Sequence, residues 1–269
     1  MNKETIILLR VLIISILSTM MISCKKEISL DLRTVPPILV VEAEISEGNT
    51  AQVKLTQTSG FYEPNIFIPI IDAKVSLSDD FGENEELTLD GDTMFVSNGI
   101  IGEINTTYYL TIVYNNKTYT SSSTLYPPVP FDSVVPKQIN SNSQPYFMVY
   151  WQDPKGKDID YYRFRIFVND SIEVKQNIVY YADIYDGEYL SMPIMISNRN
   201  NNDDHVFLPG DVLRFDMQTL DRGAGQYFSF LRKNSETNPP TNITGGALGY
   251  FCAYSMSSQS AVAPQWDVK

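Results

Sequence analysis

The chain has 269 residues, of which 32 are acidic and 20 are basic, and its formal net charge at pH 7 is −12. Such a charge repels nucleic acid and anionic lipid surfaces, and no basic stripe counters it, so nucleic acid is not an expected partner. Tyr (17) and Phe (13) are abundant and long helical periodicity is nearly absent, which is typical of an all-β protein.

The N-terminal segment has the pattern of an export signal. Lys3 and Arg10 give it a positive start, and residues 11–22 are apolar apart from two serines and one threonine. A helix of about twelve residues spans roughly 18 Å, which is short of the ~30 Å hydrocarbon core of a bilayer. The pattern therefore predicts a cleaved signal peptide over residues 1–23. Its removal leaves a net charge near −13.

Cys24 follows this run directly and is one of two cysteines in the chain. We interpret it as the acylated first residue of a lipoprotein, preceded by the small residue Ser23 and the apolar Met21. An exported domain that needed a disulfide would keep a cysteine pair. We therefore expect Cys252 to be buried and unpaired. The alternatives are an ordinary secretory signal with an incidental cysteine, or a signal anchor that is not cut.

The first half of the mature chain consists of a tether and a run of short strands. Residues 24–37 are polar, end in two prolines and are interpreted as the tether. Residues 38–126 contain seven alternating segments with frequent turns, including Asp90-Gly91, and this indicates an N-terminal β-sandwich. The aromatic and Pro-rich segment 59–69 is longer than a hairpin loop, so it is either a flap packed on the sandwich or a partner-facing loop.

The second half is predicted to be another β-sandwich, so the expected fold is all-β with two tandem Ig-like or fibronectin-III-like domains. The Pro-rich segment 127–130 interrupts the series of strands and is interpreted as the linker between the two domains. Residues 131–256 then form the second domain, with one short helix over about 224–234, for which Asp221 is a possible cap. Residues 257–269 are expected to be an unpaired tail.

Three stretches together resemble a known family. They are CKKEISLDL from Cys24 onward, PPVPFDSV at the Pro-rich joint, and NITGGALGYF over residues 242–251. The chain is similar to the Bacteroidota lipoproteins grouped as domain of unknown function 4249 over nearly all of its mature length, with Ala247 replacing a more usual Gly or Leu. The resemblance implies lipid anchoring in the outer membrane, on its periplasmic or cell-surface face. It also implies a context like that of accessory lipoproteins beside TonB-dependent transporters, and it carries over no catalytic residues.

The third motif is interpreted as a structural turn. Gly245 and Gly246 are expected to supply positive φ angles or a close backbone approach before the last strand. Asn242 is expected to hydrogen-bond its own backbone, as Asn does in many turns.

The sequence contains no pattern that singles out catalytic or metal-binding residues. His205 is the only histidine and sits in an Asn/Asp loop, so it is interpreted as solvent-exposed. Residues 201–204 offer oxygen ligands for Ca²⁺ but lack EF-hand spacing. Trp151 and the Tyr-rich strands have a chemistry suited to stacking on sugars, but they fit a sandwich core better. We therefore predict no enzymatic activity, no metal and no cofactor.

Three tripeptides resemble the Asp-Ser/Thr-apolar O-glycosylation site of exported Bacteroidota proteins. Their acceptor residues are Thr93, Ser133 and Ser171. The expected function is that of a lipid-anchored outer-membrane accessory or binding protein that partners a TonB-dependent transporter in nutrient uptake, with a cargo that the sequence does not identify. The alternative is a structural or adhesive surface module that needs no transporter.

Overall fold

The computed structural model describes Asn2, Thr5 and residues 36–60, 68–139, 146–156, 161–174, 177–196, 207–231 and 237–265. Residues 36–269 cluster as one compact unit. Cys24 and most of the segment 59–69 lie outside the described residues. No helix in the described part of the chain is long and apolar enough to cross a membrane.

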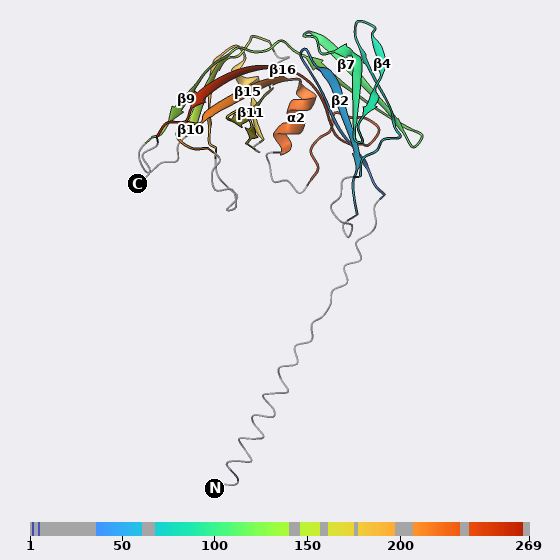
Figure 1. Ribbon diagram of the computed structural model, residues 1–269, viewed down its shortest axis with the longest axis horizontal. Coiled ribbons are helices and arrows are strands. Elements are labelled where there is room, and N and C mark those ends of the chain that lie inside the picture. Colours follow the sequence, from blue (N-terminus) through green and yellow to red (C-terminus); the bar gives the residue numbers. More distant parts are fainter. Residues whose placement is uncertain are drawn as a thin grey trace. The chain divides into compact units, whose positions relative to one another are not determined.

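The described chain is mostly β-strand, with one α-helix, and its strands form three open sheets (Figure 1). The long sheet has nine strands in the order β12-β11-β15-β16-β1-β2-β6-β5, with β13 also pairing with β11. Its strands are β1 (Leu39–Ser46), β2 (Thr50–Gln57), β5 (Thr88–Asp90), β6 (Met94–Ile101), β11 (Tyr161–Val168), β12 (Ile172–Glu173), β13 (Ile178–Tyr181), β15 (Val212–Leu220) and β16 (Leu248–Val262).

Two smaller sheets come from the remaining strands. The four-stranded sheet has the order β4-β3-β7-β8 and the three-stranded sheet the order β14-β10-β9. Their strands are β3 (Lys74–Asp79), β4 (Asn84–Glu86), β7 (Thr106–Tyr114), β8 (Lys117–Leu125), β9 (Phe131–Lys137), β10 (Tyr146–Gln152) and β14 (Tyr189–Ile194). The helix α2 covers Arg222–Leu231, and the 3₁₀ turn η1 covers Asp183–Tyr185.

Strand β16 joins the two halves of the chain. Its first part pairs in parallel with β1, and its second part pairs antiparallel with β15 as far as Val262. The expected unpaired tail from residue 257 is therefore wrong up to residue 262, because these residues belong to a ladder. The sheet also runs through both halves without a break, which differs from the expected separation into two domains.

The Pro-rich segment 127–130 is packed against the long sheet. Val129 is only 3% exposed. Its N–H donates to the hydroxyl of Thr219 at 3.3 Å, and its carbonyl accepts from the hydroxyl of Ser257 at 2.6 Å. The backbone of Val129 is thus hydrogen-bonded to both β15 and β16. The segment packs on the long sheet and does not act as the predicted linker between two domains.

Each smaller sheet covers its own part of the long sheet. The four-stranded sheet packs its Val, Leu and Tyr side chains on β1, β2, β6 and the start of β16, and this forms the first core. The three-stranded sheet packs on β11 and β15 around Trp151, which is 0% exposed, and this forms the second core. Because side chains alternate along a strand, the register along β16 places both cores on one face of the long sheet. The expectation that Trp151 is a core residue is confirmed.

The opposite face of the long sheet carries α2 (Figure 1). Ala224 and Phe228 pack on Tyr161, Leu220 and Cys252. Asp221 precedes the helix, and its carboxylate accepts the N–H of Ala224 at 2.9 Å, so the predicted cap is confirmed. The helix begins at Arg222, two residues before the predicted start at 224, and its described residues run to Leu231.

The turns follow the local sequence closely. Asn115 and Asn116 have φ 48° and 59°, as the two-residue hairpin turn between β7 and β8 requires, and Gly91 has φ 63° in the three-residue loop between β5 and β6. Strand β9 is an element that sequence reasoning missed, because Pro136 lies within it and proline disfavours a central strand. β9 is an edge strand of its sheet, where proline is tolerated.

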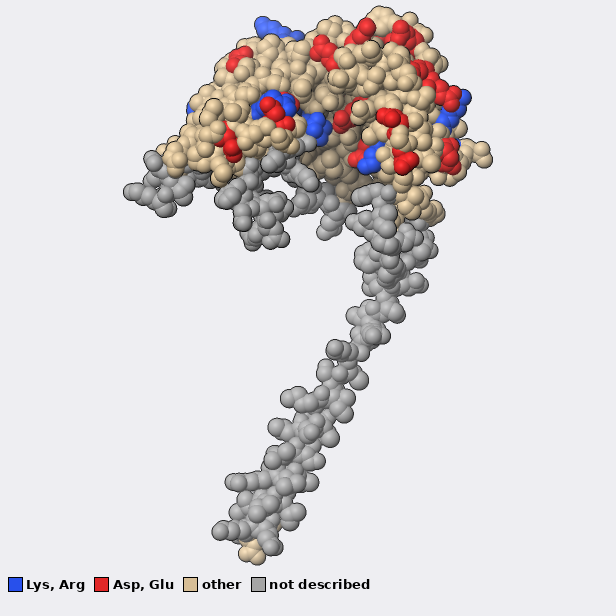
Figure 2. Space-filling model, in the orientation of Figure 1, with Lys and Arg blue, Asp and Glu red and all other residues tan. Residues whose placement is uncertain are grey.

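Acidic side chains are spread over the described surface. Figure 2 shows them gathering, in this view, over the part of the chain that contains β2, β4 and β7, while Lys and Arg are fewer. This distribution agrees with the net charge of the sequence.

Candidate functional site

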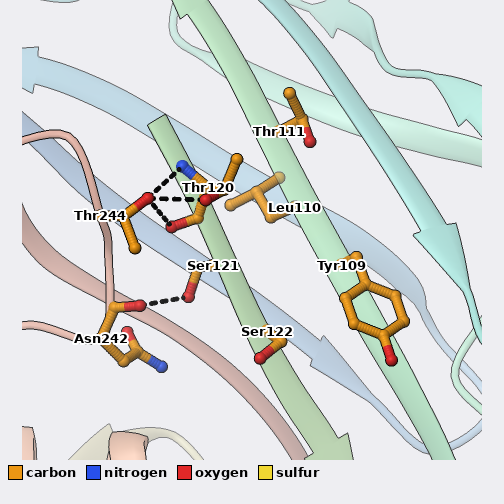
Figure 3. A pocket seen from close by; sticks show the side chains of 8 residues that line it. All are labelled: Tyr109, Leu110, Thr111, Thr120, Ser121, Ser122, Asn242 and Thr244. Atoms are coloured by element: carbon orange, nitrogen blue, oxygen red, sulfur yellow. Dashed lines mark hydrogen bonds between the residues drawn. The ribbon is translucent and has the colours of Figure 1, made fainter. Parts of the chain in front are cut away.

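The motif loop after residue 241 runs along the open edge of β8. The N–H of Thr244 donates to the carbonyl of Thr120 at 2.8 Å, and the N–H of Thr120 donates to the hydroxyl of Thr244 at 3.2 Å. The hydroxyl of Ser121 donates to the carbonyl of Asn242 at 2.8 Å (Figure 3). The loop therefore satisfies backbone groups that an edge strand would otherwise leave open.

The side chain of Asn242 fixes this loop to β16. Its amide donates to the carbonyl of Phe251 at 2.7 Å, and its oxygen accepts the N–H of Phe251 at 3.0 Å. The prediction that Asn242 bonds its own local backbone is therefore wrong, since its partner lies nine residues further along. The pair of bonds acts like one step of a β-ladder and holds the loop rigidly.

The glycines of the motif have the conformations that the sequence predicts. Gly245 and Gly246 both have φ 86°. A Cβ on Gly245 would lie 2.7 Å from the carbonyl oxygen of Thr118, whereas one on Gly246 would meet open space. Gly249 was not singled out, yet it has φ 98° and a Cβ there would lie 1.8 Å from the carbonyl oxygen of Val41. Its absent side chain permits the parallel pairing of β16 with β1.

The buried carboxylate of Asp221 also stabilises the region around this loop. Asp221 is 9% exposed and accepts hydrogen bonds from the hydroxyl of Ser123 and the N–H of Thr124 in β8. The hydroxyl of Ser123 in turn accepts the N–H of Ala253 at 2.7 Å. Burial raises the pKa of Asp221, although its hydrogen bonds act in the opposite direction. The carboxylate therefore links β8, β16 and the start of α2.

A hollow of about 370 Å³ lies beside this braced loop. Figure 3 shows its lining side chains on two neighbouring strands and on the loop. The lining residues are Tyr109, Leu110, Thr111, Thr120, Ser121, Ser122, Asn242 and Thr244. The ring of Tyr109 is 45% exposed, and the hydroxyls of Thr120 and Thr244 lie 2.6 Å apart.

The hollow belongs to a hydroxyl-rich outer face of β7 and β8. Because side chains alternate along a strand, the residues that point away from the core are every second one. On these strands they are Thr107, Tyr109, Thr111, Val113, Thr118, Thr120, Ser122 and Thr124. The hydroxyls of Thr107 and Thr124 lie 3.0 Å apart across the two strands.

Charged side chains flank this face, and none of them lines the hollow. Lys74 of β3 pairs with Glu86 at 2.9 Å, and Lys74 is the register partner of Val113. Asp80 accepts the N–H of Thr107 at the other end. Among the described lining residues there is no carboxylate, imidazole, thiol or amine, so the hollow offers hydrogen bonds and one aromatic ring but no general acid or base of the usual kind.

A second hollow, of about 410 Å³, lies over β1 and β2 and has a different character. Its lining includes Glu42 and Lys54, whose side chains pair at 3.3 Å and are both partly exposed. Sequence reasoning found neither hollow, because Ser, Thr and paired charges on alternate strand positions look like ordinary solvated residues.

The other predicted site residues are scattered. Thr93 is exposed in the turn between β5 and β6, and Ser171 is exposed in the turn between β11 and β12. Ser133 lies within β9 and is half-buried. Cys24 and His205 lie outside the described residues, as does the run 201–204. In the part of the chain that is described, no group of three or more His, Cys, Asp or Glu residues has metal-site geometry.

Cys252 is buried, as expected, and is 0% exposed on the β16 face beneath α2. Burial raises the pKa of its thiol, and the nearby charges of Glu44 and Asp221 act in the same direction. A neutral, enclosed thiol of this kind is chemically inert.

A family model described as a domain of unknown function, DUF4249, matches residues 25–260. The chain belongs to the DUF4249 family. The match spans the long sheet, both smaller sheets, α2 and the braced loop. A search of curated proteins finds no match. Membership in DUF4249 assigns no reaction to the chain.

Proposed function

We propose that this DUF4249 protein is a lipid-anchored outer-membrane accessory protein that binds a cargo and works beside a TonB-dependent transporter in nutrient uptake. The main support for a lipid anchor at Cys24 is the burial of Cys252, which is fully enclosed beneath α2 and has a raised thiol pKa. Cys252 is therefore not a disulfide partner for Cys24. Cys24 remains available for acylation at the end of an export-type signal.

A binding role, rather than a catalytic one, is supported by the braced hollow. Asn242 and Asp221 hold its rim through buried or partly buried hydrogen bonds to Phe251, Ser123 and Thr124. A site on such a rigid frame keeps its donors and acceptors in place for a ligand. Its lining offers hydrogen-bonding groups and a ring but no described acid–base pair. The acidic surface supplies a field that acts on a partner protein.

The anchor is tested by replacing the proposed lipid site. Cells that express the wild-type chain, Cys24→Ser or Cys252→Ala are fed labelled palmitate and fractionated. We expect label for the wild type and for Cys252→Ala and no label for Cys24→Ser, because serine lacks the thiol that carries the lipid, and the unlabelled variant should be released or left with its signal segment uncut. Label that persists in Cys24→Ser contradicts the anchor.

The partner is tested by gentle solubilisation and affinity purification of the tagged, lipidated chain. We expect one integral β-barrel protein to co-purify. Recovery of the chain alone at high yield contradicts the transporter partnership. Polymerisation or binding to extracellular matrix would instead favour a structural or adhesive surface module.

A further inference from the structure

The charges around the hollow restrict the class of ligand that it takes. An anion would need Lys, Arg or a helix N-terminus at the site, and a cation would need carboxylates. The eight lining residues include none of these side chains. Unlike the second hollow, in which Glu42 and Lys54 meet, this one presents only neutral polar groups and a ring. An ionic ligand would lose hydration there without gaining a counter-charge.

The groups that are present match a ligand with both hydroxyls and apolar C–H faces. Tyr109 presents a ring that is 45% exposed, and aromatic faces pack well on such C–H surfaces. Thr111 and Ser122 add hydroxyls that can donate and accept hydrogen bonds, whereas the hydroxyl of Thr244 is already bonded to Thr120. A purely apolar ligand would leave these hydroxyls unpaired, which costs affinity.

The polar face extends beyond the hollow in the direction of the strands. From Thr118 to Thr124 the outward hydroxyls of β8 follow one another over roughly 20 Å, at about 3.4 Å per residue. Thr107 and Tyr109 accompany them on β7. The face is therefore long enough for several linked rings rather than for one.

We propose that the hollow beside Asn242, together with the hydroxyl face of β7 and β8, binds a neutral oligosaccharide. Tyr109 packs against one sugar ring. Thr111, Thr120 and Ser122 hydrogen-bond its hydroxyls, and the chain of sugars follows β8 toward Thr124. This proposal rests on the binding role proposed above and names the ligand class of that site.

The test uses the full-length protein, purified in detergent, and calorimetric titration with neutral oligosaccharides of several linkages and with uronic-acid oligosaccharides of the same lengths. We expect at least one neutral series to bind, with affinity that rises with chain length, and the acidic series to bind at least tenfold more weakly. No binding by any neutral series, or a preference for the acidic one, would overturn the proposal.

Variants then locate the bound sugar. Tyr109→Ala should weaken binding about tenfold, while Tyr109→Phe keeps the ring and should stay within about threefold. Ser122→Val, which removes one hydroxyl, should weaken binding about fivefold. The matched control is Tyr189→Ala on the outer face of the three-stranded sheet, at 57% exposure, which should leave affinity unchanged. Equal affinity of Tyr109→Ala and the wild type would place the sugar elsewhere and contradict the assignment.

Two further measurements distinguish a failure of the sugar proposal from a failure of folding or of the accessory role. Thermal unfolding of each variant shows whether it is folded, and Tyr109→Thr, which also removes the ring but suits a strand, replaces Tyr109→Ala if that variant is not folded. Co-purification of a barrel partner with Tyr109→Ala tests the accessory role by itself. If the partner is retained while no neutral sugar binds, the ligand class is wrong and the accessory function stands.

Discussion

The outer faces of the two smaller sheets are made of different residues, although their inner faces are alike. On the four-stranded sheet, β7 and β8 turn hydroxyls and one tyrosine ring outward. On the three-stranded sheet the outward residues are mostly aromatic or apolar. They include Val135, Tyr146, Met148, Tyr150, Tyr189 and Pro193, and the polar residues among them are Ser133, Lys137, Gln152 and Ser191. Both inner faces pack Val, Leu, Ile and aromatic side chains on the same face of the long sheet.

Folding therefore constrains the residues of the inner faces and leaves those of the outer faces free for other roles. The tyrosines of the three-stranded sheet already have partners within it. The rings of Tyr150 and Tyr189 stack at 6.3 Å, and the hydroxyl of Tyr150 accepts from Lys137 at 2.9 Å. The hydroxyls around Tyr109 instead line a hollow. We therefore assign sugar binding to the hydroxyl face and not to the aromatic one.

The largest expected effect concerns the inner faces. Trp151→Ala in the second core and Leu110→Ala in the first should each lower the free energy of unfolding by about 3–5 kcal/mol, because each leaves a cavity in a packed core. Since β16 belongs to both halves, each variant should unfold in one transition monitored by urea titration. Two separate transitions would mean that the halves are independent domains.

The next largest effect concerns two glycines near the start of β16, where this strand pairs with β1. Gly249→Ala should lower the free energy of unfolding by roughly 3 kcal/mol or more, because its Cβ would meet the backbone of Val41. Gly246→Ala has the same kind of φ but open space, so its cost should be about 1–2 kcal/mol. Chemical denaturation of the two variants measures the contrast. Equal costs would show that the contact between β16 and β1 does not require glycine.

A smaller effect concerns Asp221 and its dependence on pH. Burial raises its pKa, so ionisation is harder in the folded than in the unfolded state. Its contribution to stability is fully present below the unfolded pKa of about 3.9 and is lost as the pH rises from there through the raised folded pKa. The stability advantage of the wild type over Asp221→Asn should therefore shrink as the pH rises.

The measurement for Asp221 is urea unfolding of both proteins at a series of pH values from acidic to neutral. Asp92→Asn is the matched control, because Asp92 is exposed in a turn. An advantage of the wild type that grows with pH would contradict the account of the buried carboxylate.

Much of the local structure could be predicted from the sequence, and the long-range pairing could not. The Asn115-Asn116 turn and the Asp221 cap are local, because their hydrogen bonds and φ angles depend on neighbouring residues. The parallel pairing of residues 248–254 with β1 joins segments about two hundred positions apart, and no local pattern encodes it. For the same reason the sequence suggested a tail after residue 256 and two separate domains.

The candidate site was predictable only in part. Gly245 and Gly246 correctly predicted a turn with positive φ angles, because glycine itself favours that conformation wherever the chain needs it. The partner of Asn242 was missed, because Phe251 lies on a different element. The hollow was missed because alternating Ser and Thr in β8 indicate a solvated strand face and nothing more.

The smallest expected effect on stability concerns the outer faces themselves. Tyr109→Ala and Tyr189→Ala should each change the free energy of unfolding by only about 0.5–1 kcal/mol, because both rings are largely exposed, at 45% and 57%. Thermal unfolding measures this. A large loss of stability for Tyr109→Ala would mean that the ring supports the fold.

The most direct measurement of the central claim is a titration of these two variants side by side with the neutral oligosaccharide that the wild type binds best. The rings are of the same type and similarly exposed, but they lie on the two different outer faces. The account predicts about tenfold weaker binding for Tyr109→Ala and unchanged binding for Tyr189→Ala. The reverse pattern would contradict it and assign the sugar to the aromatic face.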